Sequence, residues 1–73
     1  MQLNKDEREI EFEDNISELI AMKSNAGWYA GRIYLHEEED YYEPHSRESG
    51  YFKTPQEVEN LIHYWGNDIL PLR

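Results

Sequence analysis

The chain has 73 residues, of which sixteen are acidic and seven are Lys or Arg, and its net charge is −9. A chain of this length forms one domain and buries only about 60% of its unfolded surface, so self-association is an economical way to add stability. The negative charge repels phosphate backbones and anionic lipids, which argues against direct binding to nucleic acid or to a membrane. Its two Trp, six Tyr and two Phe residues argue against a disordered chain.

Two absences bear on the cellular compartment. The sequence has no cysteine, which leaves no disulfide framework, thiolate metal site or cysteine nucleophile, and which fits a reducing environment. It also has no basic region followed by an apolar run, and no stretch near the roughly 20 apolar residues that span a bilayer. We therefore expect a cytoplasmic protein.

The N-terminal part of the chain contains the first predicted strand. We expect the polar residues 1–8 to be frayed. Residues 8–13 then alternate strictly, with Ile10 and Phe12 on one face, as in a half-buried strand. Three glutamates share the outer face of this strand: Glu9, Glu11 and Glu13.

Residues 15–26 allow two interpretations. Asn15 followed by Glu18 has the spacing of a capping box, and the apolar residues after Asn15 have helical spacing, which predicts a short second helix ending near Gly27. A strand is the alternative, because so short an apolar run cannot be assigned by its period alone. Such a strand would place four residues at alternate positions: Ile16, Glu18, Ile20 and Met22.

Residues 28–36 are rich in aromatic and branched side chains, which predicts a strand. Residues 37–40 are four consecutive acids that predict a turn, and an extended character resumes at Tyr41, so the simple reading is a hairpin. Pro44 cannot donate a ladder hydrogen bond, which places the second strand at a sheet edge or ends it there. On the first strand, alternation puts Trp28, Ala30, Arg32 and Tyr34 on one face.

The C-terminal third gives the clearest structural signal. Thr54 is a good helix cap, Pro55 suits the first helical position, and Glu57 completes a capping box. Gly66 predicts the end of the helix after about three turns, and Pro71 would stop any continuation. Four apolar residues form one stripe along this helix: Val58, Leu61, Ile62 and Trp65.

Together these elements predict a single α+β domain over residues 1–73, with an antiparallel sheet of three or four strands. We expect residues 51–53 to form a short strand before the C-terminal helix, and we expect that helix to pack across one face of the sheet. We expect the apolar stripe of the helix to contact Ile33, Leu35, Phe12 or Ile10, together with a Trp or Tyr ring.

The unit of strand, capped turn and helix resembles small domains such as the arm-binding modules of phage-type integrases. Those modules bind DNA through basic strands, whereas the corresponding strands here are acidic. The resemblance therefore implies no function for this chain.

The sequence contains no pattern typical of catalysis or metal binding. Its three histidines lack ligand spacing, its serines lack a nucleophile context, and the acidic run at residues 37–40 lacks the alternating donors of a calcium loop. We therefore expect no enzyme activity, no cofactor and no metal ion.

Eleven of the sixteen acidic residues lie within two segments, 6–14 and 37–43. On a strand, alternate carboxylates would repeat at roughly 6.7 Å, close to the spacing of successive phosphates in a nucleic-acid strand. Such a face fits the basic groove of a DNA- or RNA-binding protein, and neighbouring tyrosines would supply apolar anchors. The predicted partner-binding residues are Glu9, Glu11, Glu13, Glu37, Glu38, Glu39, Asp40, Tyr41, Tyr42 and Glu43.

These observations predict a non-enzymatic, acidic protein-binding module that inhibits or regulates a basic, nucleic-acid-handling partner, in the manner of a DNA mimic. Small inhibitors encoded by phages and mobile elements have this size and charge. The alternative is a small accessory or assembly subunit of a larger complex, whose aromatic surface is covered by a neighbour and whose charge serves solubility.

Overall fold

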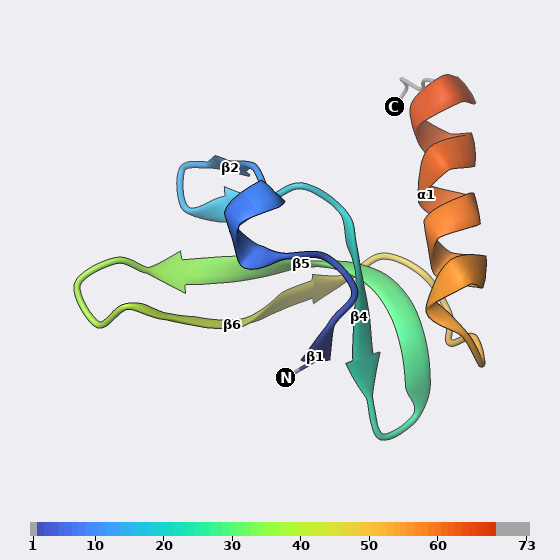
Figure 1. Cartoon of the computed structure of the whole chain (residues 1–73), viewed down its shortest axis with the longest axis horizontal. Helices are drawn as coiled ribbons and strands as arrows, with labels where there is room; N and C mark the ends of the chain where they lie inside the picture. Colours follow the sequence, from blue (N-terminus) through green and yellow to red (C-terminus); the bar gives the residue numbers. More distant parts are fainter. Residues whose placement is uncertain (1, 69–73) are drawn as a thin grey trace.

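The computed structural model describes residues 2–68 and shows one curled antiparallel sheet followed by a helix, α1 (Pro55–Asp68) (Figure 1). The α+β class and the C-terminal helix are as predicted. Across the described residues the sheet has six strands, more than the three or four predicted, and there is no second α-helix. The strands are β1 (Gln2–Leu3), β2 (Phe12–Glu13), β3 (Ile16–Ser17), β4 (Ile20–Ser24), β5 (Gly27–His36) and β6 (Tyr41–Arg47).

The long strand β5 is the centre of the sheet. Along one edge it pairs with β4 through residues 27–31 and with β3 at Tyr34, and along the other edge it pairs with β6 through residues 31–36. β1 extends the sheet beyond β4, and β2 extends it beyond β3. The strand predicted at residues 28–36 is thus confirmed. Its apolar residues are dense because its first half is buried on both faces.

The predicted hairpin around residues 37–40 is confirmed, and its second strand is longer than expected. β6 continues through Pro44 as far as Arg47. Among the described strands β6 pairs with β5 alone, so it is an edge strand, where the missing N–H of Pro44 is tolerated. A register shift between Arg32 and Ile33 marks a bulge in this pairing.

Residues 15–26 contain β3 and β4, so the short helix is wrong and the strand alternative is correct in part: the single predicted strand is interrupted at residues 18 and 19. Asp14 and Asn15 have positive φ values of 54° and 68°, as both central residues of a type I′ hairpin turn require. This turn joins β2 to β3, and its left-handed backbone prevents Asn15 from capping a helix. Asn25 and Ala26 likewise form the turn between β4 and β5 instead of a helix end.

The strand predicted at residues 8–13 is wrong except for its last two residues, which form β2. The Asp6 carboxylate accepts a hydrogen bond from the backbone N–H of Arg8 (2.9 Å), and the Asp6 carbonyl accepts one from the backbone N–H of Glu9 (2.9 Å). These bonds close a 3-10 helix, η1 (Glu7–Glu9). Ile10 follows and is buried in the core.

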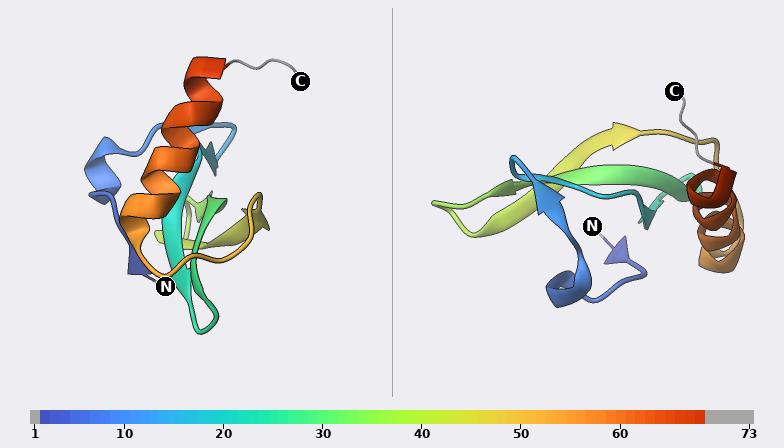
Figure 2. Two further views of the ribbon diagram at one scale, coloured as in Figure 1. Left: turned by 90° about the vertical axis from the view of Figure 1, so that its right-hand side faces the viewer. Right: turned by 90° about the horizontal axis from the view of Figure 1, so that it is seen from above.

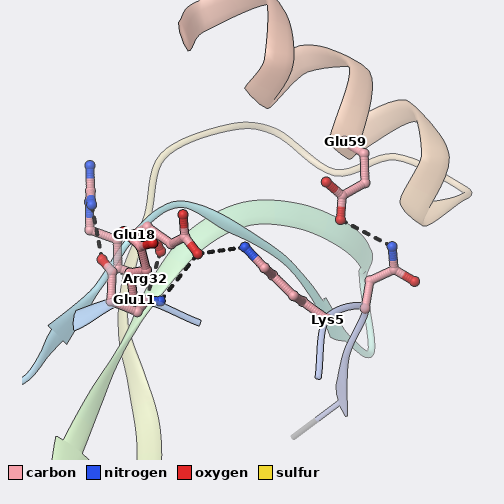
Figure 3. A network of polar contacts seen from close by, with 7 residues as sticks. Lys5, Glu11, Glu18, Arg32 and Glu59 are labelled. Atoms are coloured by element: carbon pink, nitrogen blue, oxygen red, sulfur yellow. Dashed lines mark hydrogen bonds and ion pairs between the residues drawn. The ribbon is translucent and has the colours of Figure 1, made fainter. Parts of the chain in front are cut away.

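The first eight residues, expected to be frayed, include the strand β1, which pairs with β4. Two hydrogen bonds between side chains also connect this segment to the rest of the molecule (Figure 3). Lys5 Nζ donates to Glu18 Oε2 at 2.6 Å, and Asn4 Nδ2 donates to Glu59 Oε2 at 3.1 Å. The N-terminal segment is therefore held against both the sheet and α1.

Each face of the sheet carries its own hydrophobic cluster. The N-terminal segment contributes to the first cluster, which contains Ile10, Ile20, Met22, Tyr29 and Ile33. The helix contributes Val58 to the second cluster, where it lies with Ala21, Trp28 and Ala30.

The predicted contact of the helix with Ile33, Leu35, Phe12 or Ile10 is wrong. Ile33, Ile10 and Phe12 belong to the opposite face, which the N-terminal segment occupies. The predicted contact of the helix with a Trp or Tyr ring is confirmed, because Trp28 and Val58 of α1 belong to the same hydrophobic cluster.

The predicted start of α1 is confirmed. Thr54 N donates to Glu57 Oε1 at 3.1 Å and Glu57 N donates to Thr54 Oγ1 at 3.3 Å, which is the reciprocal pattern of a capping box. The helix continues through Gly66 to Asp68, so its predicted end at Gly66 is wrong. Pro71 lies outside the described residues.

The strand predicted at residues 51–53 is reduced to a single bridge. Phe52 N donates to Trp28 O at 2.7 Å, and Trp28 N donates to Phe52 O at 2.8 Å. Gly27 permits this close approach, because an ideal Cβ there would lie 2.8 Å from Phe52 O and because its φ is +134°. The bridge brings the chain to the start of α1 beside the centre of the sheet.

Candidate functional site

One half of the sheet face that carries α1 is left uncovered by the helix. The helix packs on Trp28 and Ala30 of β5, and the next residues on the same face of that strand are Arg32, Tyr34 and His36. Figure 2 shows α1 at one end of the sheet and the β5–β6 hairpin extending away from it. We call Arg32, Tyr34 and His36, with their partners on β6, the open face.

Four rings form a row along the open face. The Tyr34 ring makes an edge contact with His36, with centroids 4.8 Å apart, and a tilted contact with His45 at 6.3 Å. The His36 ring stacks on Tyr41 at 4.5 Å, with 11° between the ring planes. Tyr41 is at the outer end of the row and is 45% exposed. We call His45, Tyr34, His36 and Tyr41 the aromatic ladder.

Glu43 adds a carboxylate to the aromatic ladder. Its Oε2 lies 3.0 Å from Nε2 of His36, within ion-pair distance, and this buried Nε2 has no hydrogen-bond partner among the described residues. The pKa of the Tyr41 phenol is raised by partial desolvation and by the negative charges of Glu43 and Glu39. The outer end of the ladder therefore lies in a negative electrostatic field.

A cavity of about 880 Å³ opens beside the ladder, between the β2–β3 hairpin and the end of β6. Arg32 and His45 line it, so it is continuous with the open face. We call this cavity the acidic groove. Its acidic lining residues are Glu11, Glu13, Asp14, Glu18 and Glu48.

Hydrogen bonds hold the walls of the acidic groove in place (Figure 3). Glu18 Oε2 accepts from Lys5 Nζ at 2.6 Å and from the backbone N–H of Glu11 at 3.2 Å. Arg32 Nη1 donates to the carbonyl oxygen of Ser17 at 3.0 Å. The hydrogen bond that Lys5 donates to Glu18 is the main reason why the pKa of Lys5 is raised. These contacts join the segment that carries Glu11 to the centre of the sheet.

The turn that ends the first acidic segment lies beside the hairpin that carries the second, away from α1. Leu35 N donates to Asn15 O at 2.8 Å, and Asn15 Nδ2 donates to Leu35 O at 3.1 Å. These bonds hold the β2–β3 turn, which includes Asp14, against the β5–β6 hairpin, whose turn is residues 37–40 (Figure 1). The end of the first acidic segment therefore lies beside the hairpin that carries the second, whereas its beginning follows Asn4, which is bonded to Glu59 of α1.

The three predicted glutamates of residues 8–13 do not share one face. Glu11 and Glu13 line the acidic groove, whereas Glu9 lies in η1 and outside the groove lining. Since this segment is not a continuous strand, the regular array of carboxylates predicted from alternation does not form.

The predicted residues of the β5–β6 hairpin are also divided between two faces. Tyr41 and Glu43 flank His36 on the open face. Tyr42 lies on the opposite face, where its ring stacks on Phe12 with centroids 5.8 Å apart and packs against the first hydrophobic cluster. The other four predicted residues are exposed in the turn: Glu37, Glu38, Glu39 and Asp40.

Sequence reasoning missed several residues of the open face and the groove. Glu18 and Glu48 lie outside the two acidic segments, so clustering along the chain could not identify them. Arg32 lies near Glu48, with its Nε 3.9 Å from Glu48 Oε2, and its Nη1 bonds the carbonyl of Ser17, the residue before Glu18. The aromatic ladder could have been found in part from the sequence, because alternation along β5 places Tyr34 and His36 on one face with Arg32.

The chemistry available at this site is the binding of cations through carboxylates and aromatic rings. Across the described residues, no three His, Asp or Glu side chains gather in a way that would hold a metal ion. No helix within residues 2–68 has the length and apolar character needed to cross a bilayer. No protein-family profile, curated protein sequence or solved structure matches the chain.

Proposed function

We propose that this chain is a non-enzymatic acidic module that binds a basic surface of another protein, one that handles nucleic acid. The observation that supports this proposal is the acidic groove, whose five carboxylates come from segments far apart in the sequence and whose β2–β3 turn lies against the β5–β6 hairpin. A concave surface with several carboxylates attracts Arg and Lys side chains and raises the rate of association with a basic partner. The net charge of −9 extends that attraction over longer distances.

Inhibition would follow from competition for the partner's basic surface. A surface that is occupied by this module cannot bind phosphates at the same time. The support comes from the clustering of carboxylates and not from a phosphate-like repeat, because residues 8–13 lack the regular strand that such a repeat needs.

A second candidate function is that of an accessory subunit in a larger complex. It is favoured by large aromatic side chains that remain exposed, Tyr41 at 45% and Tyr64 at 63%. A subunit of this kind would bury these rings against a neighbour, and its binding would depend little on salt.

The test is affinity capture with the full chain at ionic strengths of about 0.01 M and about 0.1 M, followed by mass spectrometry of the captured proteins. We expect basic nucleic-acid-binding proteins that are lost at the higher ionic strength, and we expect the free chain to displace DNA or RNA from them. The double variant Glu11→Gln, Glu13→Gln should weaken capture, because it removes two carboxylates from the groove.

The matched control is the double variant Glu9→Gln, Glu59→Gln, which changes the net charge equally at two sites outside the groove lining. Glutamine at residue 59 can still accept the hydrogen bond from Asn4. Equal loss of binding in both double variants would mean that net charge and not the groove is responsible. Capture that resists salt and depends on the exposed tyrosines would favour the accessory subunit instead.

A further inference from the structure

We infer that the aromatic ladder recognises arginine, so that the partner presents its positive charge to the open face as guanidinium groups stacked on Tyr41. This inference rests on the proposed function and specifies the chemistry of the basic partner.

The first argument is the geometry of Tyr41. One side of its ring is covered by His36 at 4.5 Å, and 45% of the residue is exposed, so the ring offers a flat apolar surface to solvent. A guanidinium group is planar and weakly hydrated, and it stacks on aromatic rings more readily than a compact ammonium group does. The His36 ring supports Tyr41 from behind, which fixes the orientation of the exposed surface.

The second argument is the charge around the ring. Glu43 approaches His36 at 3.0 Å within the ladder, and the charges of Glu43 and Glu39 both act on the Tyr41 phenol. A guanidinium stacked on the ring keeps its N–H donors at its edge, where they can reach carboxylates. An aromatic surface bordered by carboxylates is therefore complementary to arginine in both shape and charge.

The third argument is that this chain already uses the same arrangement on the other face of the same hairpin. The guanidinium carbon of Arg47 lies 4.9 Å from the centroid of the Tyr51 ring, and its Nη1 donates to the carbonyl oxygen of Ser49 at 2.8 Å. Arg47 thus stacks on an aromatic ring and donates a hydrogen bond to an oxygen atom at the same time. The ladder offers the same combination to an arginine from outside.

The experiment uses two synthetic peptides of equal length and charge, an Arg-Gly repeat and a Lys-Gly repeat. Their binding to the full chain is measured by fluorescence polarisation at about 0.01 M ionic strength. We expect the Arg-Gly peptide to bind about three- to fivefold more tightly, which is the ratio that one exposed cation–π contact supplies.

Three variants test the role of the ring. Tyr41→Ala should reduce the preference for the Arg-Gly peptide to less than about twofold, with little change for the Lys-Gly peptide, and Tyr41→Phe should keep the preference. Tyr64→Ala removes an exposed tyrosine from α1 and should change neither affinity. In the wild-type chain, the ring protons of Tyr41 should shift in NMR spectra as the Arg-Gly peptide is added.

Equal binding of the two peptides, or a preference that survives Tyr41→Ala, would overturn the inference about arginine while leaving the proposed function in place. Failure of both peptides to bind at low ionic strength would reject the proposed function as well.

Discussion

Ser17 is a buried polar residue whose replacement should destabilise the sheet at one identifiable point, the N–H group of Ile33. It is 1% exposed, and its Oγ accepts a hydrogen bond from the backbone N–H of Ile33 at 2.9 Å and donates to the carbonyl of Glu18 at 2.8 Å. Ser17 is the last residue of β3, and β4 begins only at Ile20. At this interruption, the Ser17 hydroxyl accepts the hydrogen bond from the Ile33 N–H that a carbonyl of a neighbouring strand would accept in a continuous ladder. Ser17→Ala removes one oxygen atom with little change in packing.

The expected cost is that of a buried N–H group without a partner, about 1–3 kcal/mol. The total stability of a chain of this size is roughly 4–11 kcal/mol, from about 0.05–0.15 kcal/mol per residue. Ser17→Ala should therefore lower the midpoint of urea denaturation clearly. The dependence of the unfolding free energy on urea concentration should stay the same, because the variant exposes the same surface area on unfolding. Each kcal/mol should lower the Tm by about 4–8 °C. Tryptophan fluorescence reports the transition, since Trp28 is buried.

The matched control is Ser49→Ala. Ser49 Oγ accepts from the backbone N–H of Ala30 at 2.8 Å, on the β6 side of the same strand, but Ser49 is only half-buried. Water can replace its hydroxyl, so the loss should be smaller, about 1 kcal/mol or less. Hydrogen exchange of the Ile33 amide should accelerate in Ser17→Ala alone. Equal losses in the two variants, or unchanged exchange at Ile33, would refute this reasoning.

Three further outcomes are expected. Thr54→Ala should cost about 1 kcal/mol in urea denaturation, because it removes half of the capping box. Gly31→Ala should cost about 1–3 kcal/mol, because its Cβ would lie 2.4 Å from a carbonyl oxygen of β6, whereas Gly50→Ala, with nothing within 4 Å, should stay within about 0.5 kcal/mol. The pKa of Asp6 is held below its ordinary value, first by the Arg8 guanidinium and then by the Arg8 N–H. The stabilisation from this contact is therefore present at neutral pH and is lost as the pH falls through the folded-state pKa of Asp6. Arg8→Ala should raise the midpoint of the Asp6 titration measured by NMR.

The candidate site could be predicted from the sequence in part. The excess of carboxylates is visible in the composition, and alternation along β5 places Tyr34 and His36 on one face. The acidic groove could not be predicted, because Glu18 and Glu48 join it through contacts between segments far apart in the chain. Tyr41 and Tyr42 are neighbours in the sequence, yet the pleat of β6 sends them to opposite faces.

The sequence by itself determined the elements whose signals are local and unambiguous. The cap at Thr54 begins α1, the aromatic run from Trp28 forms β5, and Pro44 lies on an edge strand. Each of these signals acts within a few residues, through a side chain that bonds its own backbone, a dense apolar run or a missing N–H group.

Tertiary structure decided the conformation of the segments whose local sequence is compatible with more than one kind of secondary structure. The left-handed backbone of Asp14 and Asn15 suits a hairpin, and the two hydrogen bonds between Asn15 and Leu35 hold that hairpin against β5. Ile10 is buried by contact with residues of β4 and β5, which bends residues 8–13 away from a continuous strand. Short apolar runs gain most of their stability from the surface they pack against, and that surface exists only after the rest of the chain has folded.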